Sequence, residues 1–314
     1  MLQSTTSLSP SASIIASWTH ENWNPVLGCE IASPGCSHCY AMEIAGRLLK
    51  KNVQKYKGLV DLSKRHPVWT GIMRPDFDRL KRPYAWKKSR LVFVNSMTDL
   101  FHDPVPDSYL LKIWEVMAKT PWHHYWLLTK RPERMRHFIE KIAKVTLPNL
   151  WLGASVEHAQ TLSRIETLRK VPAAIRFVTF EPLIASVGTP DLRQIDLIYV
   201  GGESGDRARP MRTEWIEAIF KACRRDGAGF CFHQWGTYGE DGIKRNRKEN
   251  GNLFKGKTWN EVPPSAYDSV IEASQKWEKT KEEKKLRASV QKLTPKAQEN
   301  DLFDTISPLH DLKK

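Results

Sequence analysis

The chain has 314 residues, of which 40% are hydrophobic and 27% charged, and it carries a formal net charge of +14 at pH 7. A chain of this length buries roughly three quarters of its unfolded surface, which is enough for one large α/β barrel or for two smaller domains. It contains no run near the ~20 apolar residues that span a bilayer, and the apolar patch at residues 14–16 is too short for a secretion signal. We therefore expect a cytoplasmic protein without a membrane segment.

The N-terminal part of the chain predicts a tail, a strand and a helix. Residues 1–17 are rich in serine and are expected to be disordered. A first strand is expected near the sequence NWNPVLGC, and a helix is expected to start near residue 40.

The segment 47–90 that follows is strongly basic, because it holds fourteen Lys or Arg against three Asp or Glu, a net charge of +11. Basic residues interleaved with aromatic ones suit a nucleic acid whose bases can stack. A solvated pair of lysine-rich helices would explain the same composition. The candidate nucleic-acid contacts are Lys50, Lys51, Lys55, Lys57, Lys64, Arg65, Trp69 and Trp86.

Short, apolar, β-rich segments then alternate with helical ones. The predicted strands are residues 90–96, 123–130, 149–157, 174–182, 196–204 and 229–236. The predicted helices are residues 108–120, 132–145, 158–170 and 212–227. About seven βα units in succession predict an α/β fold, either a doubly wound sheet or a TIM-type barrel. Residues 264–314 predict a charged tail that is helical or disordered.

Polar residues close each predicted strand at its carboxyl end, and this feature favours the barrel. In a β/α barrel the carboxyl ends of all strands converge on one rim, where functional groups collect. We therefore predict a partial TIM-type β/α barrel over residues 18–263, with the basic segment 47–90 as an insertion. The rim residues are Asn95, Ser96, Asp99, Lys130, Arg131, Glu157, Glu181, Glu203 and Gln234.

Three of the five cysteines follow the first predicted strand, in the sequence GCEIASPGCSHCYA. These are Cys29, Cys36 and Cys39, and they fall on the predicted rim. In a reducing compartment, clustered cysteines more often bind metal or do chemistry than form disulfides. The other two, Cys223 and Cys231, are expected to be buried structural thiols.

The spacing of the three cysteines leaves three interpretations open. A structural zinc ion takes four ligands, so that His20, His38 or His233 would have to complete a zinc site. A cubane iron–sulfur cluster normally takes four thiolates, one for each iron, so that three cysteines leave one iron open to a substrate or cofactor. The third interpretation is packing without a metal.

A partial β/α barrel with a three-cysteine loop after its first strand resembles the radical S-adenosylmethionine (SAM) superfamily. The resemblance implies that Cys29, Cys36 and Cys39 hold a [4Fe-4S] cluster and that SAM chelates the open iron. It also implies cleavage of SAM to methionine and a 5′-deoxyadenosyl radical. The spacing departs from the superfamily pattern, because six residues rather than three separate the first two cysteines, whereas the gap of two residues before Cys39 is kept.

A closer resemblance covers roughly residues 18–263. The segments WNPVLGCEIASPGCSHCYA, VFVNSMTDLFHDPVP, LLTKRPERM, LWLGASVE, RFVTFEPL, YVGGESGDRARPM and FHQWG resemble a phage-associated three-Cys-motif family of radical-SAM-like proteins, most of them of unassigned function. This resemblance implies that a separate three-Cys-motif protein is a candidate partner. The residues implied to hold SAM are Asn95, Ser96, Asp99, Lys130, Ser155, Glu157, Glu181 and Glu203.

These patterns lead to one main hypothesis and two alternatives. The main hypothesis is a radical SAM iron–sulfur enzyme of phage or mobile-element origin that acts on a nucleic acid or a nucleotide. The first alternative is a nucleic-acid-binding protein that is stabilised by zinc and has no catalytic activity. The second is a TIM-barrel hydrolase that uses the rim glutamates as general acid and base. Arg207 and Arg209 are candidates for binding an anionic group.

Overall fold

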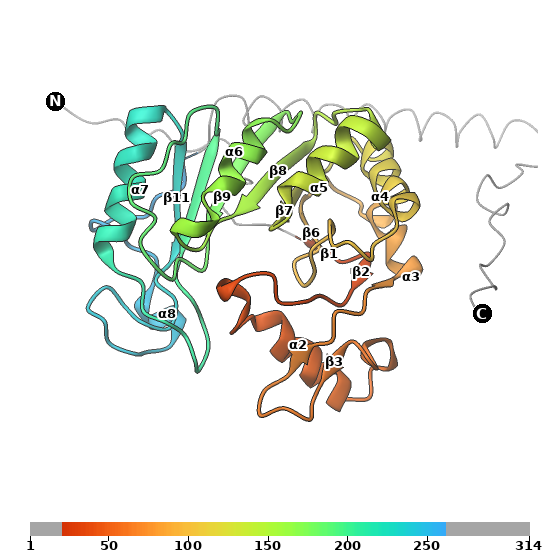
Figure 1. The fold of residues 1–314 in the computed structure, drawn as a ribbon, viewed down its shortest axis with the longest axis horizontal. Coiled ribbons are helices and arrows are strands. Elements are labelled where there is room, and N and C mark those ends of the chain that lie inside the picture. Colours follow the sequence, from red (N-terminus) through yellow and green to blue (C-terminus); the bar gives the residue numbers. More distant parts are fainter. Residues whose placement is uncertain (1–20, 262–314) are drawn as a thin grey trace, which may run out of the picture.

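The computed structural model describes residues 21–261 (Figure 1). The predicted disordered N-terminus (1–17) and the predicted charged tail (264–314) lie outside the described residues. Within the described part of the chain, no helix is both long and apolar enough to cross a membrane.

A single parallel sheet of seven strands organises the fold. Its strands are β1 (Glu21–Trp23), β6 (Leu91–Val94), β7 (His124–Thr129), β8 (Leu150–Ser155), β9 (Ile175–Phe180), β10 (Leu197–Gly201) and β11 (Gly229–Gln234). They lie side by side in chain order, and every neighbouring pair is parallel. This order is that of a β/α barrel. Because β1 and β11 are the two edges of the sheet, the curled sheet is an open half-barrel.

Helices cover the convex face of this sheet (Figure 1). They are α4 (Asp107–Lys119), α5 (Pro132–His137), the π-helical η4 (Phe138–Ala143), the short η5 (Ala159–Thr161), α6 (Ser163–Arg169) and α7 (Thr213–Asp226). The largest hydrophobic core lies between these helices and the strands. Helix α7 ends at Gly227, whose φ of +79° suits glycine, as the sequence predicts.

Two predicted helices differ from the structure. The predicted helix 132–145 is α-helical only in its first half and π-helical in its second. The predicted helix 158–170 begins with a 3-10 turn, and its α-helix starts at Ser163. In addition, no helix connects β9 to β10, and within the described residues β11 is followed only by the four-residue α8 (Arg247–Asn250). The barrel is therefore less regular than seven complete βα units.

The concave face of the sheet carries a second, smaller core. Its members are Leu91, Trp126, Trp151, Ile175, Phe177, Leu197, Tyr199 and Cys231. The rings of Trp126 and Trp151 stack with their centroids 5.0 Å apart. Phe93 and Leu128 pack against this aromatic layer and also line a cavity above it. The inside of the half-barrel is thus filled at one end and open at the other.

The basic segment 47–90 forms a small lobe rather than a pair of lysine-rich helices. Its elements, with those that lead into it, are β2 (Val26–Leu27), η1 (Pro34–Cys36), α2 (Tyr40–Lys50), η2 (Gln54–Tyr56), β3 (Val60–Asp61), β4 (Val68–Trp69), β5 (Arg74–Pro75), α3 (Phe77–Leu80) and η3 (Arg82–Ala85). Strands β2 and β5 form one antiparallel pair, and β3 and β4 form another. The lobe has its own core around Met42, Tyr56 and Trp69, and Cys29 and Cys39 pack against that core. In Figure 1 it lies at the end of the sheet toward which the strands point.

Candidate functional site

A cavity of about 670 Å³ opens at the carboxyl ends of the strands. Its volume lies within the range of about 300–1,000 Å³ that is typical of small-molecule sites. Residues at the end of, or after, β1, β6, β7, β8, β9, β10 and β11 all contribute to its lining. The carboxyl ends of the strands therefore converge on one site, as the sequence predicts for a barrel rim.

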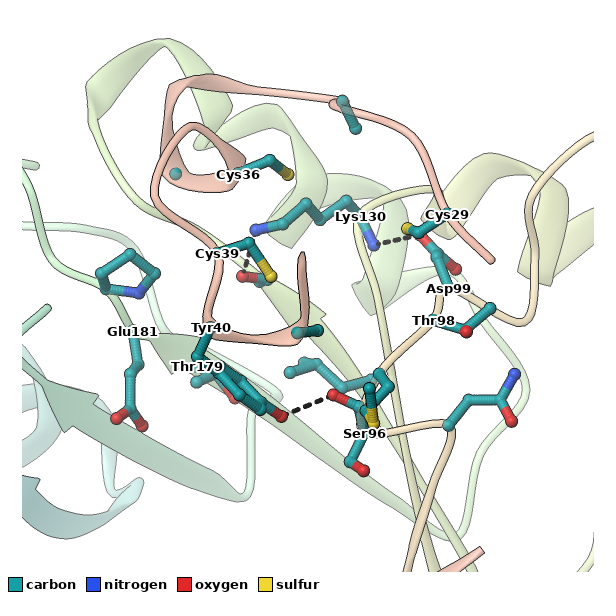
Figure 2. A pocket seen from close by; sticks show the side chains of 18 of the residues that line it. Cys29, Cys36, Cys39, Tyr40, Ser96, Thr98, Asp99, Lys130, Thr179 and Glu181 are labelled. Atoms are coloured by element: carbon teal, nitrogen blue, oxygen red, sulfur yellow. Dashed lines mark hydrogen bonds between the residues drawn. The ribbon is translucent and has the colours of Figure 1, made fainter. Parts of the chain in front are cut away.

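The thiols of Cys29, Cys36 and Cys39 all line this cavity (Figure 2). None of them forms a disulfide, and Cys36 is only 9% exposed. Burial raises the pKa of Cys29 to about 12 and also raises the pKa of Cys39. Both thiols are therefore protonated at neutral pH in the metal-free protein, and a metal has to displace their protons in order to bind.

Within residues 21–261 no group of three His, Cys, Asp or Glu side chains is arranged to hold a metal ion. Three thiols that line one cavity are nevertheless the type of donor that a zinc ion or an iron–sulfur cluster takes. Of the possible additional zinc ligands, His38 and His233 line the cavity, whereas His20 lies outside the described residues.

Hydrogen bonds from three different parts of the sheet fix the cysteine loop, which we define as residues 28–40. The hydroxyl of Ser33 donates to Glu157 Oε1 over 2.8 Å, after β8. The carbonyl oxygen of Pro34 accepts a hydrogen bond of 3.1 Å from Arg209. At the end of the loop, the hydroxyl of Tyr40 donates to the carbonyl oxygen of Ser96 over 2.6 Å. The positions of the thiols are therefore set by the strand ends.

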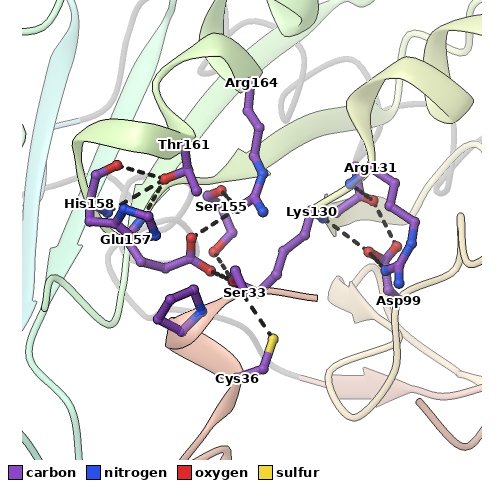
Figure 3. Close-up of polar contacts among 12 residues, drawn as sticks. Ser33, Cys36, Asp99, Lys130, Arg131, Ser155, Glu157, His158, Thr161 and Arg164 are labelled. Carbon is purple, nitrogen blue, oxygen red and sulfur yellow. Dashed lines mark hydrogen bonds and ion pairs between the residues drawn. The ribbon is translucent and has the colours of Figure 1, made fainter. Parts of the chain in front are cut away.

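Of the residues that hold the cysteine loop, Glu157 accepts hydrogen bonds from several side chains at once (Figure 3). Its side chain is fully buried, and it accepts hydrogen bonds from Ser33, Lys130 and Arg164. A Cβ atom at Gly35 would lie 2.5 Å from the Glu157 side chain, so that the loop needs glycine there to pack on the carboxylate. Glu157 does not line the cavity. Although the sequence predicts a contact with SAM, its observed contacts are those of a positioning residue.

Lys130 lies between the cysteines and this anchor, as Figures 2 and 3 show. Its ammonium group donates to Ser155 Oγ over 2.8 Å and to Glu157. Burial lowers the pKa of Lys130 to about 8. Lys130 and Ser155 both line the cavity, so these two predicted site residues are brought together with the thiols.

Asp99 lines the cavity beside Cys29, but its carboxylate is already occupied by protein groups. It accepts hydrogen bonds from the Thr129 hydroxyl at 2.7 Å, from the Lys130 amide at 3.0 Å and from Arg131 at 2.9 Å. Arg131 in turn contacts Glu30, the residue after Cys29. Asp99 therefore joins the end of β7 to the cysteine loop.

Glu203 has a similar role on the other side of the loop. Although burial raises its pKa, two hydrogen bonds from the Arg209 side chain and one from the Arg209 amide lower that pKa overall. Its carboxylate also lies 3.4 Å from His38 Nδ1. Arg209, a candidate for binding an anion, is thus paired within the protein, and Arg207 lies 3.6 Å from the carboxylate of Glu43.

Three cavity residues have buried polar atoms that find no hydrogen-bond partner in the described part of the chain. They are Asn95, through both atoms of its amide, Thr179 and Ser204. Asn95 belongs to the predicted SAM set, whereas the sequence analysis did not single out Thr179 or Ser204. Both lie inside predicted strands, and only their position at the rim could have marked them. Unpaired buried polar groups are costly unless a ligand or water satisfies them, so these three point to a polar ligand.

The remaining predicted SAM residues differ in how they can reach a ligand. Ser96 lines the cavity, and its hydroxyl is hydrogen-bonded to the side chain of Asn24. Glu181 lines the cavity at a distance from Cys29 in Figure 2, and its carboxylate contacts His233 and Gln234. The cavity therefore has one end near Cys29 and another end near Glu181 (Figure 2).

The predicted nucleic-acid residues fall into two groups. Lys50, Lys51, Lys57, Lys64 and Arg65 are exposed on the basic lobe.

The other three are not freely exposed. Lys55 is paired with Asp76 at 3.0 Å. Trp69 is buried and lines the cavity, and Trp86 is half-buried with its ring 5.2 Å from that of His123. The two tryptophans are therefore not surface platforms for stacking, because the lobe and the main core use them for packing.

The fold and the site together define an open β/α half-barrel that presents a three-cysteine loop to a cavity at its rim. Residues 13–263 match the model of a family described as "Protein of unknown function (DUF5131)", and the chain belongs to that family. No curated protein matches the chain, and no solved structure matches it.

Replacing Glu157 with glutamine should destabilise the protein and free the cysteine loop. The change removes a buried charge that faces Lys130 and Arg164, a loss that costs about 3–5 kcal/mol for buried ion pairs. We expect a lower unfolding midpoint in urea and faster alkylation of Cys36 by iodoacetamide, followed by mass spectrometry.

The matched control is Glu166→Gln, which removes a carboxylate that is 59% exposed and contacts only Arg169. It should leave both measurements nearly unchanged. Equal alkylation rates in the wild type and in Glu157→Gln would show that Glu157 does not position the loop.

Proposed function

We propose that the protein is a radical SAM iron–sulfur enzyme of the cytoplasm. The observation that supports this most strongly is the position of its three thiols, which one loop delivers to a single cavity at the convergent ends of parallel strands. The same cavity contains the buried side-chain amide of Asn95, which has no hydrogen-bond partner within residues 21–261. A soft metal cluster and a polar organic ligand would together satisfy these groups.

In this proposal the thiolates of Cys29, Cys36 and Cys39 would hold a [4Fe-4S] cluster and leave one iron open to SAM. The reduced cluster would supply one electron for the cleavage of SAM to methionine and a 5′-deoxyadenosyl radical, which would abstract hydrogen from a substrate.

In this proposal the residues of the chain bind SAM and fix the position of the cysteine loop. Asn95 can donate to a carboxylate or accept from an ammonium group, and no group among the described residues is hydrogen-bonded to its side-chain amide. Ser96 and Ser155 add polar atoms to the cavity. Glu157, Asp99 and Lys130 hold the loop and the strand ends in place.

The contacts favour this proposal over the hydrolase alternative. Glu157 lies outside the cavity lining and is fully buried, and Glu203 is bound by Arg209. Two of the three rim glutamates are thus occupied by basic side chains, which leaves no pair of free carboxylates to act as acid and base. The zinc alternative predicts stoichiometric zinc and no iron. The measurement of bound iron described below distinguishes it from the cluster.

We also propose a nucleic acid or nucleotide as the partner or substrate, supported by the exposed cations of the basic lobe. Among the described residues, no carboxylate is paired with Lys50, Lys51 or Lys57, and the lobe borders the cavity through Trp69. Unpaired, exposed cations of this kind attract a polyanion. A separate three-Cys-motif protein is the protein partner that the resemblance suggests.

Anaerobic reconstitution with iron and sulfide should load about four irons on each chain. Cys29→Ala, Cys36→Ala and Cys39→Ala should each lose most of this iron and the associated absorption near 400 nm. Cys223→Ala is the matched control, because that thiol is buried in the main core away from the cavity. Stoichiometric zinc without iron, or equal iron in all four variants, would contradict the cluster.

The affinity for nucleic acid should fall steeply with salt if the basic lobe contacts phosphates. Replacing Lys50 and Lys51 with glutamine should flatten the log–log slope by about 0.9 for each lost duplex contact, or about 0.7 for each single-strand contact. Lys141→Gln with Lys144→Gln is the control, because it removes the same charge from exposed positions beside η4. Filter binding from low to physiological salt measures the slopes. Absence of binding at low salt, or identical slopes for the two variants, would rule out the lobe as the contact.

A further inference from the structure

The end of the cavity near β9 and β11 contains an ordered carboxylate–imidazole pair. The two oxygens of Glu181 lie 2.9 and 3.0 Å from His233 Nδ1, and Gln234 donates to Glu181 Oε1 over 2.8 Å. All three residues line the cavity. The pair is held from two strands, and it takes no part in anchoring the cysteine loop.

A glycine between the two strands makes this pair possible. Gly201 ends β10, which lies between β9 and β11 in the sheet. A Cβ atom there would lie 2.6 Å from the carboxyl carbon of Glu181. The absence of a side chain at Gly201 thus lets Glu181 reach across β10 to His233. Because this contact depends on a glycine within the sheet, the sheet itself determines the position of the Glu181–His233 pair.

The charges at this end leave one cation without a partner. Glu181 is matched by His233 and Glu203 by Arg209. Arg247, at the start of α8, lines the same cavity and is exposed, and within residues 21–261 no carboxylate forms an ion pair with it. Arg247 therefore places a guanidinium group without a carboxylate partner at this end of the cavity.

Two hydroxyl groups add hydrogen-bond donors to the same cavity. Thr179, near the end of β9 and two residues before Glu181, is 2% exposed, and its Oγ1 has no partner among the described residues. The hydroxyl of Ser204, three residues after β10, is likewise buried and has no partner within residues 21–261. Both residues line the cavity. A guanidinium group and unsatisfied hydroxyls in one cavity match the needs of an oxyanion.

We propose that the Glu181–His233 end of the cavity is a binding subsite for an anionic group of the substrate, a phosphate or a carboxylate. Arg247 supplies the charge, Thr179 and Ser204 supply neutral donors, and the Glu181–His233 pair forms a fixed wall of the subsite. This inference names the chemical class of the substrate in the proposed function and rests on that function for the reaction. The binding itself depends only on residues of this chain and needs no iron.

Isothermal titration of the full-length protein with inorganic phosphate and, separately, with acetate tests the subsite and distinguishes the two anions. We expect the wild type to bind at least one of them. Arg247→Gln should weaken that binding by about tenfold or more, the effect of losing one charge-assisted hydrogen bond. His233→Gln should weaken it as well. Lys248→Gln is the control, because it removes the same charge from the next residue, which does not line the cavity.

Equal affinities for the wild type and Arg247→Gln, or no binding of either anion by the wild type, would overturn the subsite. The titration is made before and after reconstitution with iron, so that the two proposals fail separately. Binding that depends on Arg247 in a protein that takes up no iron would support the subsite and contradict only the proposed enzyme. Iron uptake by a protein that binds neither anion would contradict only the subsite.

Discussion

The buried carboxylate of Glu157 is the contact on which the candidate site depends. A fully buried charge is tolerated only when other groups neutralise and hydrogen-bond it, and Lys130, Arg164 and Ser33 do so here. Since Ser33 belongs to the cysteine loop, the same contact joins that loop to β8. Gly35 lets the loop pack directly on the carboxylate. Without Glu157, the loop would lose its contact with the end of β8, although its contacts at Glu30, Pro34 and Tyr40 would remain.

The concave face of the half-barrel is divided between packing and binding. An aromatic layer that includes Trp126, Trp151 and Phe177 fills the space toward the amino ends of the strands. Phe177 packs so closely on β8 that a Cβ atom at Gly153 would lie 2.3 Å from its ring. Polar residues occupy the carboxyl ends, where the cavity opens. A rigid apolar layer beneath polar side chains supports the fixed geometry that binding and catalysis need.

The sequence predicted the sheet and the place of the site better than the roles of individual residues. Strands with continuous apolar runs and polar ends are recognisable because both of their faces are covered, and the position of Cys36 after the first strand placed it on the rim. Residue type alone could not show that Glu157 faces two cations or that Trp69 is buried, because those contacts join segments far apart in the chain. Arg247 escaped notice for the same reason.

The most direct test of the proposed enzyme is whether the reconstituted, reduced protein cleaves SAM. The account predicts 5′-deoxyadenosine and methionine, even at a slow rate without substrate, measured by chromatography under anaerobic conditions. Asn95→Ala should bind SAM at least tenfold more weakly, because a hydrogen bond to a charged group is worth about 1.5–3 kcal/mol. Asn52→Ala is the matched control, since that asparagine also has positive φ but is exposed and lies outside the cavity. Iron-loaded protein that neither binds nor cleaves SAM would contradict the account.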